Sequence, residues 1–255
     1  MKAWPSWVIG GLSGLVVLGV WVGVTSAGLI RDLFLPGPLD VWDGLRELMD
    51  EGYKGRSLLE HMGVSLMRVG AGFVSGAVVG TGLGLAMGHW RRVDAAAGPF
   101  IEFLRPLPQL AYLVLLIIWL GIGETSKITM LFLAALPVAA VAARDGVRNV
   151  PGERLLVARA MGASEWQVFR HVVLPSALPE VLVGARLAAG IVYGTLIAAE
   201  IISGANGIGW MILDAGRFLR SDYVFVGILM IGMAGVLIDR LLVLLERRVV
   251  HWAGR

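Results

Sequence analysis

Residues 151 to 175 of this 255-residue chain read PGERLLVARAMGASEWQVFRHVVLP, a charged segment between two strongly apolar stretches. Within it, the run Ser164 to Gln167 predicts a capping box that starts a helix, and Gly162 just before it predicts the end of another helix. Because a residue that precedes proline is pushed out of helical geometry, Leu174-Pro175 is expected to close the segment. The pattern therefore predicts two short helices, broken at a glycine, that dock on a partner.

The rest of the chain is unusually apolar. Hydrophobic residues make up 57% of it and charged residues only 16%, which departs from the composition of soluble globular domains. The charges are clustered, so that apolar runs of about 20 residues remain, the length that crosses a bilayer core. This predicts an all-α, polytopic membrane protein. The chain has no cysteine and its four histidines are scattered, so we expect no disulfide, no metal site and no cofactor in this chain.

Six transmembrane helices are predicted from the apolar runs. They are expected at residues 7–30, 64–88, 99–120, 128–143, 177–202 and 224–245. The chain then divides into an N-terminal transmembrane helix at 1–30, a polar segment at 31–63, a core with five transmembrane helices at 64–248, and a tail at 249–255.

The first apolar run has a competing interpretation as a signal peptide. Thr25-Ser26-Ala27 mimics a cleavage site with small residues. The run is long for a signal peptide, however, and Trp4, Trp7 and Trp21 suit anchoring at a membrane interface. We therefore favour a retained transmembrane helix.

The polar segment 31–63 is net acidic and carries two helix signals. Pro38 starts an amphipathic helix that is expected to lie on the membrane surface. Ser57 and Glu60 form a second capping box, which starts the helix leading into the next span. The apolar face of the amphipathic helix comprises Val41, Trp42, Leu45, Leu48 and Met49.

Glycine and proline mark the second and third spans. Gly72, Gly76, Gly80 and Gly84 recur every four residues, a stripe that lets another helix approach closely. Such a stripe serves either a tight interface in a moving protein or ordinary membrane packing. Pro106 and Pro108 predict that the first turns of the third span are broken or kinked.

The distribution of positive charge predicts on which side of the membrane each loop lies. With six spans, a predicted turn at Arg91-Arg92, the arginine-rich segment 144–175 and the basic tail, which includes Arg255, fall on one side. The acidic segment 31–63 and the turn at Gly121 fall on the other side. Because positively charged loops stay in the cytoplasm, both termini and residues 151–175 are predicted to be cytoplasmic.

No catalytic motif is present. The sequence has no phosphate-binding glycine loop with its lysine, no histidines at helical spacing and no Gly-x-Ser-x-Gly turn. We therefore expect a chain that is not an enzyme. If it moves a solute actively, another subunit or an ion gradient must supply the energy.

Charged residues within the predicted spans are candidates for a translocation path or gate, because charge is costly there unless it is paired or faces water. Glu102 and Arg105 lie three residues apart and are expected to pair on one helical face. Arg186 and Glu200 belong to the fifth span. Each has an alternative role, in an internal ion pair, as a charged side chain that reaches out from the end of a span, or in packing. An ion pair or a position at the span end is favoured for Asp239 and Arg240 in the sixth span.

Residues 156–175 resemble the cytoplasmic signature of ATP-binding-cassette importer permeases, which is Glu-Ala-Ala, three residues, Gly, nine residues and Ile-x-Leu-Pro. Gly162 is followed by nine residues and then by Val-Val-Leu-Pro at 172–175, and Ala158 stands at the second alanine. Leu156 and Val157 depart from the first two positions. The segment therefore lacks any salt bridge that the glutamate would make.

Motifs elsewhere extend the resemblance to the nitrate, sulfonate and taurine permease subfamily. They are FLPGP at 34–38, RPLP at 105–108, WLGIGETSK at 119–127, GAS at 162–164, LPSALP at 174–179 and AAE at 198–200. The resemblance implies a type I importer permease fold in the bacterial inner membrane and transport of taurine or another alkylsulfonate. Nitrate, bicarbonate or another small solute is the alternative.

The same resemblance implies the partners. They are a second permease copy, two cytoplasmic subunits that hold ATP and Mg²⁺, a periplasmic or lipid-anchored substrate-binding protein and membrane lipid, with no nucleic acid. The segment 151–175 would be a coupling helix seated on the ATP-binding subunit, and Trp166 and Phe169 would either dock there or pack on the ends of this chain's own spans. The expected docking residues are Arg154, Ala158, Arg159, Gly162, Ala163, Ser164, Trp166, Phe169, Leu174 and Pro175.

Two other classes remain open at the level of sequence. An ion-coupled secondary transporter would show internal repeats and paired broken helices at the bilayer midplane. A non-transporting membrane scaffold could recruit a cytoplasmic protein through residues 151–175, but it has no use for polar residues inside its spans.

Overall fold

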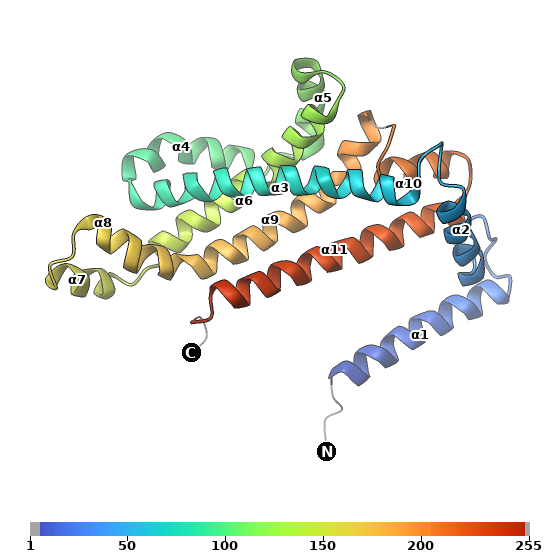
Figure 1. Cartoon of the computed structure of the whole chain (residues 1–255), viewed down its shortest axis with the longest axis horizontal. Coiled ribbons are helices and arrows are strands. Elements are labelled where there is room, and N and C mark those ends of the chain that lie inside the picture. Colours follow the sequence, from blue (N-terminus) through green and yellow to red (C-terminus); the bar gives the residue numbers. More distant parts are fainter. Residues whose placement is uncertain (1–5, 204, 253–255) are drawn as a thin grey trace. The chain divides into compact units, whose positions relative to one another are not determined.

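The computed structural model describes residues 6–203 and 205–252, so that Lys2, Trp4 and Arg255 lie outside the described residues. The chain forms two compact units, one from residues 1–63 and 206–232 and the other from residues 64–205 and 233–255. We call them unit 1 and unit 2. The described helices are α1 Ser6–Ser26, α2 Pro38–Asp50, α3 Leu58–His89, α4 Arg91–Leu104, α5 Gln109–Leu120, α6 Glu124–Arg148, α7 Gly152–Ala160, α8 Glu165–Val168, the π-helix η1 Phe169–Val173, α9 Leu174–Ser203, α10 Ile208–Arg217 and α11 Ser221–Val249 (Figure 1).

Four helical stretches of the described chain are long and apolar enough to cross a bilayer: α3, α6, α11 and the continuous helix of residues 165–201. The pair α4 and α5, bent by 104° at its break, makes a fifth span if it is counted as one. The apolar part of α1, Gly10–Ser26, is shorter. Five of the six predicted apolar runs lie largely within one helix each, and the run 99–120 is divided between α4 and α5. The crossing of the membrane by α1 stays a prediction.

The prolines break the chain where predicted, but the helices on either side differ from the prediction. Arg91 and Arg92 were predicted in a turn, and instead they begin α4. The break falls between Leu104 and Gln109, and it separates two helices rather than kinking the first turns of one. Pro106 and Pro108 lack the amide donors that a continuous helix requires at this point.

The prediction that Leu174-Pro175 ends the coupling segment is wrong. Leu174 has helical backbone angles (φ −59°, ψ −48°), and its N–H donates to the carbonyl of Phe169 five residues earlier. A π-turn is wider than an α-turn, so it can receive the following proline without the usual helical pairing. Residues 151–175, which we call the coupling segment, therefore continue directly into α9, the fifth predicted span.

Unit 1 has a core that the sequence did not predict. The polar loop expected at 203–223 contains α10, which buries Ile208 and Met211 in one apolar cluster. The amphipathic helix α2 begins at Pro38 as predicted and buries Val41 and Leu48 in the same cluster. Its Trp42 and Met49 are exposed. Only part of the predicted apolar face of α2 is therefore available to the membrane surface.

The start of α3 confirms the second capping box. The Ser57 amide donates to Glu60 Oε2 at 3.0 Å, and the Glu60 amide donates to Ser57 Oγ at 3.2 Å. These reciprocal bonds satisfy two amides that the first helical turn leaves unpaired.

In unit 2, the glycine stripe of α3 packs against α6. A β-carbon added at Gly76 would lie 2.6 Å from Ala135 Cβ and 2.6 Å from the Phe132 carbonyl oxygen. At Gly84 it would collide with the carbonyl of Ala140. The predicted close helix contact is therefore confirmed, and α6 is the partner.

Gly84→Ala is expected to destabilise the protein by about 1–3 kcal/mol, because the added methyl group must push α3 away from the backbone of α6. Gly82→Ala is the matched control, since a β-carbon at Gly82 meets nothing within 4 Å. Thermal unfolding of both purified variants in mild detergent measures the difference. Equal melting temperatures would contradict the packing described for the stripe.

Candidate coupling surface and buried charge network

The predicted break at a glycine between two helices is confirmed, but only the first helix, α7, is short, because α8 continues through η1 into α9. Gly162 follows α7 with φ +83°, a left-handed conformation that glycine adopts without steric cost. Ser164 then caps α8: its N–H donates to Gln167 Oε1 at 2.8 Å, and the Gln167 N–H donates to Ser164 Oγ at 3.4 Å. The two local signals fix the direction in which α8 leaves α7.

Large apolar side chains of this segment stand exposed. Leu156, Val157, Met161 and Trp166 are 66%, 59%, 83% and 66% exposed. We call these four side chains the coupling surface. Exposed apolar side chains on such a charged segment make it a candidate surface for a protein partner. Leu156 and Val157 are the two positions at which the sequence departs from the permease signature.

The two aromatic residues of the segment differ in environment. Their rings stack with centroids 5.9 Å apart, and Trp166 is exposed. Phe169 is partly buried, and its ring centroid lies 4.9 Å from that of His89 at the end of α3. Phe169, Ala158 and Ala163 also pack on one cluster of buried residues. Phe169 therefore packs on its own chain, whereas Trp166 remains exposed.

Two of the arginines expected to contact a partner have internal partners. Arg159 forms a two-pronged pair with Glu165 at 2.9 and 3.0 Å, and this carboxylate raises the pKa of the Arg159 guanidinium. Arg154 Nη1 donates to Ser176 Oγ at 3.4 Å. Arg170 is exposed, while Leu174 and Pro175 are half-buried.

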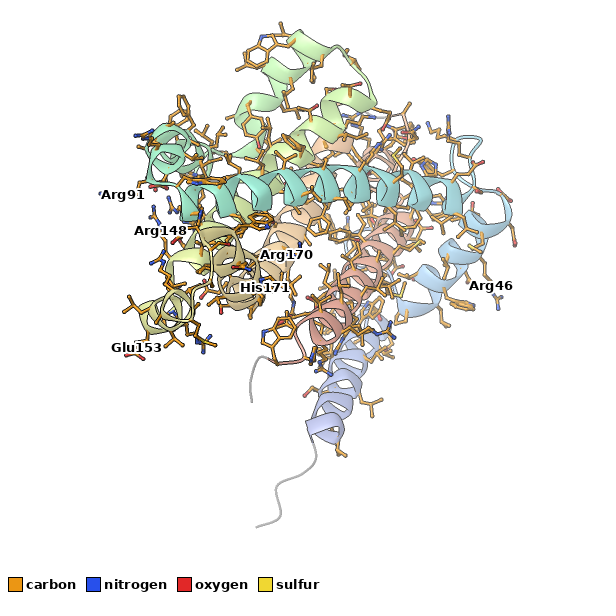
Figure 2. All side chains as sticks on the ribbon, turned by 60° about the vertical axis from the view of Figure 1, so that its left-hand side comes forward. Arg46, Arg91, Arg148, Glu153, Arg170 and His171 are labelled. Atoms are coloured by element: carbon orange, nitrogen blue, oxygen red, sulfur yellow. The ribbon has the colours of Figure 1, made fainter. Side chains whose placement is uncertain are left out.

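Basic residues gather at the coupling-segment end of unit 2. Arg148 at the end of α6 pairs with Asp94 of α4 at 2.6 Å, which joins these two helices beside the start of α7. Figure 2 shows Arg91, Arg148 and Arg170 at this end, together with Glu153 of α7. Two of the basic segments that the sequence assigned to one side of the membrane, Arg91-Arg92 and 144–175, thus lie at the same end of unit 2.

The predicted local pair of Glu102 and Arg105 is wrong. Glu102 Oε1 instead accepts a hydrogen bond at 2.9 Å from Arg144 Nη1 of α6, a largely buried guanidinium. Arg105 lies just past the end of α4 and is exposed. Helix α4 packs beside α6, so a cation 42 residues away in the chain is closer than the neighbour on the same turn.

Arg186 takes part in an ion pair and also lines a cavity. Its Nε and Nη2 donate to the two carboxylate oxygens of Asp239 at 2.6 and 3.0 Å, which joins α9 to α11. Of the two alternatives expected for Asp239, the structure has the internal ion pair. Both residues also line a cavity of about 240 Å³ together with Tyr193.

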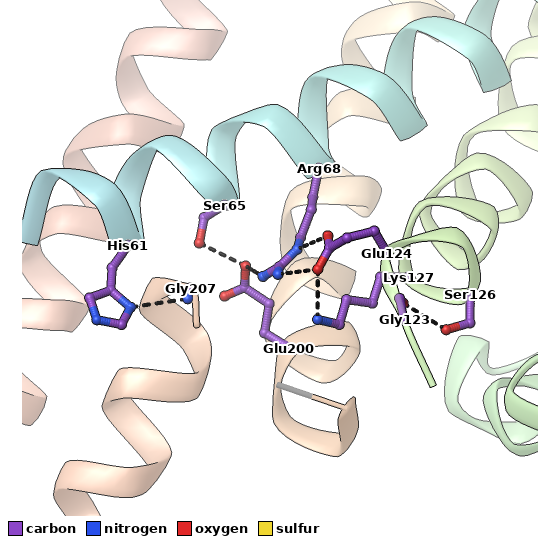
Figure 3. A network of polar contacts seen from close by, with 9 residues as sticks. All are labelled: His61, Ser65, Arg68, Gly123, Glu124, Ser126, Lys127, Glu200 and Gly207. Atoms are coloured by element: carbon purple, nitrogen blue, oxygen red, sulfur yellow. Dashed lines mark hydrogen bonds and ion pairs between the residues drawn. The ribbon is translucent and has the colours of Figure 1, made fainter. Parts of the chain in front are cut away.

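Glu200 is fully buried, and it belongs to a network of charges that joins three helices (Figure 3). Its Oε1 accepts hydrogen bonds from Ser65 Oγ and from Arg68 Nη1, each at 2.7 Å. The Arg68 guanidinium also donates from Nε and Nη2 to the two oxygens of Glu124, each at 2.6 Å. Lys127 Nζ donates to Glu124 Oε1 at 3.1 Å. We call Arg68, Glu124, Lys127 and Glu200 the buried charge network.

The network balances two cations with two carboxylates. Arg68 and Glu200 have no exposed surface and Lys127 is 3% exposed, whereas the side chain of Glu124 is 44% exposed. Buried ions must be paired and hydrogen-bonded, because removal from water costs several kcal/mol for each ion. The structure thus places Glu200 in a polar cluster that links α3, α6 and α9.

Sequence reasoning missed three members of this network. Arg68 lies inside the apolar run 64–88, and the rule that singled out Glu200 as a costly intramembrane charge applies to it equally. Glu124 and Lys127 were assigned to a turn, but α6 begins at Glu124 and carries both into the protein. Among residues 6–203 and 205–252, no group of three or more His, Cys, Asp or Glu side chains could hold a metal ion.

Comparison with known proteins agrees with this architecture. The permease subunit TauC of the taurine transport system of Escherichia coli K12 is 40% identical over 240 residues, which cover 94% of this chain and 87% of that protein. A putative aliphatic sulfonates permease, SsuC of Bacillus subtilis 168, is 33% identical over 96% of this chain and 88% of its own length.

Solved structures share the fold. A structure of the methionine ATP-binding-cassette transporter MetNI in an inward-facing conformation superimposes with a TM-score of 0.58 and 24% identity, over 72% of this chain and 95% of that chain. The predicted importer permease fold is thereby confirmed. The family model for the binding-protein-dependent transport system inner membrane component matches residues 76–251. The chain therefore belongs to this family of multi-pass permeases of ATP-binding-cassette importers.

Proposed function

We propose that this chain is the permease subunit of an ATP-driven importer that carries taurine or another alkylsulfonate across the bacterial cytoplasmic membrane by alternating access. The observation that carries the proposal is the 40% identity to a taurine permease along 94% of the chain. The bicarbonate permease CmpB of Synechococcus elongatus is 31% identical over 95% of the chain. Nitrate, bicarbonate or another small solute is therefore the alternative cargo.

Energy comes from other subunits in this proposal. Two cytoplasmic ATP-binding subunits, which hold ATP and Mg²⁺, dock on the coupling segments of two permease copies. The exposed side chains of Leu156, Val157, Met161 and Trp166 support this contact, because an aromatic anchor among apolar neighbours is typical of the energetic centre of an interface. A periplasmic or lipid-anchored binding protein delivers the solute from outside.

Orientation follows from charge. The end of unit 2 that carries Arg91, Arg148 and Arg170 faces the cytoplasm, since basic loops stay on that side. Both chain termini are then cytoplasmic, and residues 31–63 are periplasmic. The first residue of α6, Glu124, lies toward the outer side in this orientation.

Uptake of radiolabelled taurine tests the proposal. Proteoliposomes hold the permease with its ATP-binding subunits, and the binding protein is added outside. We expect taurine uptake that requires internal ATP and is competed by methanesulfonate. Uptake that needs an ion gradient but no ATP-binding subunit would identify a secondary transporter, uptake of bicarbonate or nitrate alone would identify the alternative cargo, and no uptake of any solute would favour a scaffold.

A further inference from the structure

We propose that Arg68 and Lys127 form a binding site for a small anion, and that the carboxylate of Glu124 occupies this site in the structure as an internal stand-in. An alkylsulfonate exchanges with Glu124 during transport. The choice of a sulfonate rests on the proposed function. The site itself rests on the geometry of the buried charge network.

The contacts to Glu124 are those that a bound anion would receive. Arg68 presents Nε and Nη2 as a planar fork at 2.6 Å from both oxygens, and Lys127 Nζ adds a third donor at 3.1 Å. Such a fork recognises carboxylates and other oxyanions through two parallel, charge-assisted hydrogen bonds. A sulfonate has the same single negative charge and offers three oxygens to these donors.

The two carboxylates of the network are held differently. Glu200 has no exposed surface and is held by Ser65 as well as by Arg68. Glu124 is 44% exposed and is the first residue of α6, directly after the Gly121-Ile-Gly123 turn in which Gly121 has φ +80°. Rotation of its side chain therefore moves the Glu124 carboxylate out of the protein, whereas Glu200 stays in place.

Charge balance makes the step an exchange. With Glu200 retained, Arg68 and Lys127 leave one positive charge in excess when Glu124 departs. An unpaired buried charge is strongly unfavourable, so that an incoming anion must replace the carboxylate. The released Glu124 carboxylate can then pair with the ammonium group of a zwitterionic sulfonate. The site thereby favours anions, and among them those that carry an amine.

Binding of methanesulfonate tests the inference. The full-length permease, purified with its ATP-binding subunits and placed in lipid nanodiscs, is titrated calorimetrically without the binding protein. Glu124→Gln keeps the shape of the side chain and removes its charge. We expect this variant to bind methanesulfonate at least about tenfold more tightly than the unaltered complex, because the competing charge is gone and charge-assisted hydrogen bonds are strong. The uncharged isostere methanesulfonamide is expected not to bind.

Two control variants separate this site from a general effect of charge. Glu165→Gln removes a carboxylate from an arginine fork of the same kind, in which Arg159 is solvent-exposed, and it should create no measurable binding. Adding Lys127→Gln to Glu124→Gln should abolish the gain. A Glu124→Gln complex that melts like the unaltered one and binds methanesulfonate no more tightly overturns the inference.

A second variant tests the inference if the Glu124→Gln permease does not assemble with its ATP-binding subunits. Glu124→Asp keeps the charge and shortens the reach to Arg68, so it should also bind methanesulfonate more tightly than the unaltered complex. Equal affinity overturns the inference. The proposed function fails separately: no taurine uptake by the unaltered complex, with tight methanesulfonate binding by Glu124→Gln, would refute the cargo and keep the anion site.

Discussion

Arg68→Gln is expected to destabilise the protein by about 3–5 kcal/mol, the cost of leaving a buried charge without its partner. Glu200 has no exposed surface, and apart from Arg68 its Oε1 accepts a hydrogen bond from Ser65, which is uncharged. Arg68→Gln therefore removes the guanidinium that balances this buried negative charge. Thermal unfolding of the purified variant, followed by tryptophan fluorescence in mild detergent, measures the loss.

A double variant and a matched arginine make this prediction specific. Arg68→Gln combined with Glu200→Gln removes both charges and should regain most of the lost stability, because neutral side chains can remain hydrogen-bonded to one another. Arg159→Gln breaks a two-pronged pair outside the membrane spans, whose two partners are 48% and 67% exposed, and should change the melting temperature little. If Arg68→Gln melts like Arg159→Gln, the network does not hold the helices together.

Gly162→Val is expected to abolish both taurine uptake and the stimulation of ATP hydrolysis by the loaded binding protein. The backbone at Gly162 has φ +83°, a conformation that costs an ordinary residue about 1–2 kcal/mol and is least favourable for a β-branched one. Valine would therefore shift the turn between α7 and α8 and misplace Trp166. The loss of stability should stay close to this backbone strain, since nothing lies within 4 Å of a β-carbon at this position and no steric clash is added.

Asparagine distinguishes backbone strain from added bulk. Gly162→Asn should keep most of the uptake, because asparagine enters the left-handed conformation more readily than other residues. Gly152→Val is the matched control: this glycine begins α7, also has free space around it and has no positive φ. Normal uptake by Gly162→Val would show that the turn is not needed for coupling.

Local patterns in the sequence predicted local structure well. The capping boxes at Ser57 and Ser164 and the glycine break at Gly162 depend on residues within a few positions of one another, and the structure confirms all three. The glycine stripe on α3 predicted a close contact, although only the structure identifies α6 as the partner. Local signals of this kind need no knowledge of the tertiary fold.

Long-range pairing could not be predicted. Glu200 meets Arg68 across 132 residues, and Glu102 meets Arg144 across 42 residues, because the packing of α3, α4, α6 and α9 decides which charges are neighbours. Helix α10 was not predicted for another reason. The charged residues in and around it made the segment look like a polar loop, although one of its faces is apolar. A helix end was predicted at Leu174-Pro175, because the residue before a proline is disfavoured in an α-helix. The π-turn at 169–173 is an arrangement to which that rule does not apply.

The continuity of residues 165–201 has a mechanical consequence. One helix connects the exposed Trp166 at one end to the buried Glu200 near the other, and the π-turn lies close to the first end. At 1.5 Å per residue its 37 residues span about 55 Å. No loop interrupts the helix between these two residues. A displacement of Trp166 must therefore either shift Glu200 as well or bend the helix at the π-turn.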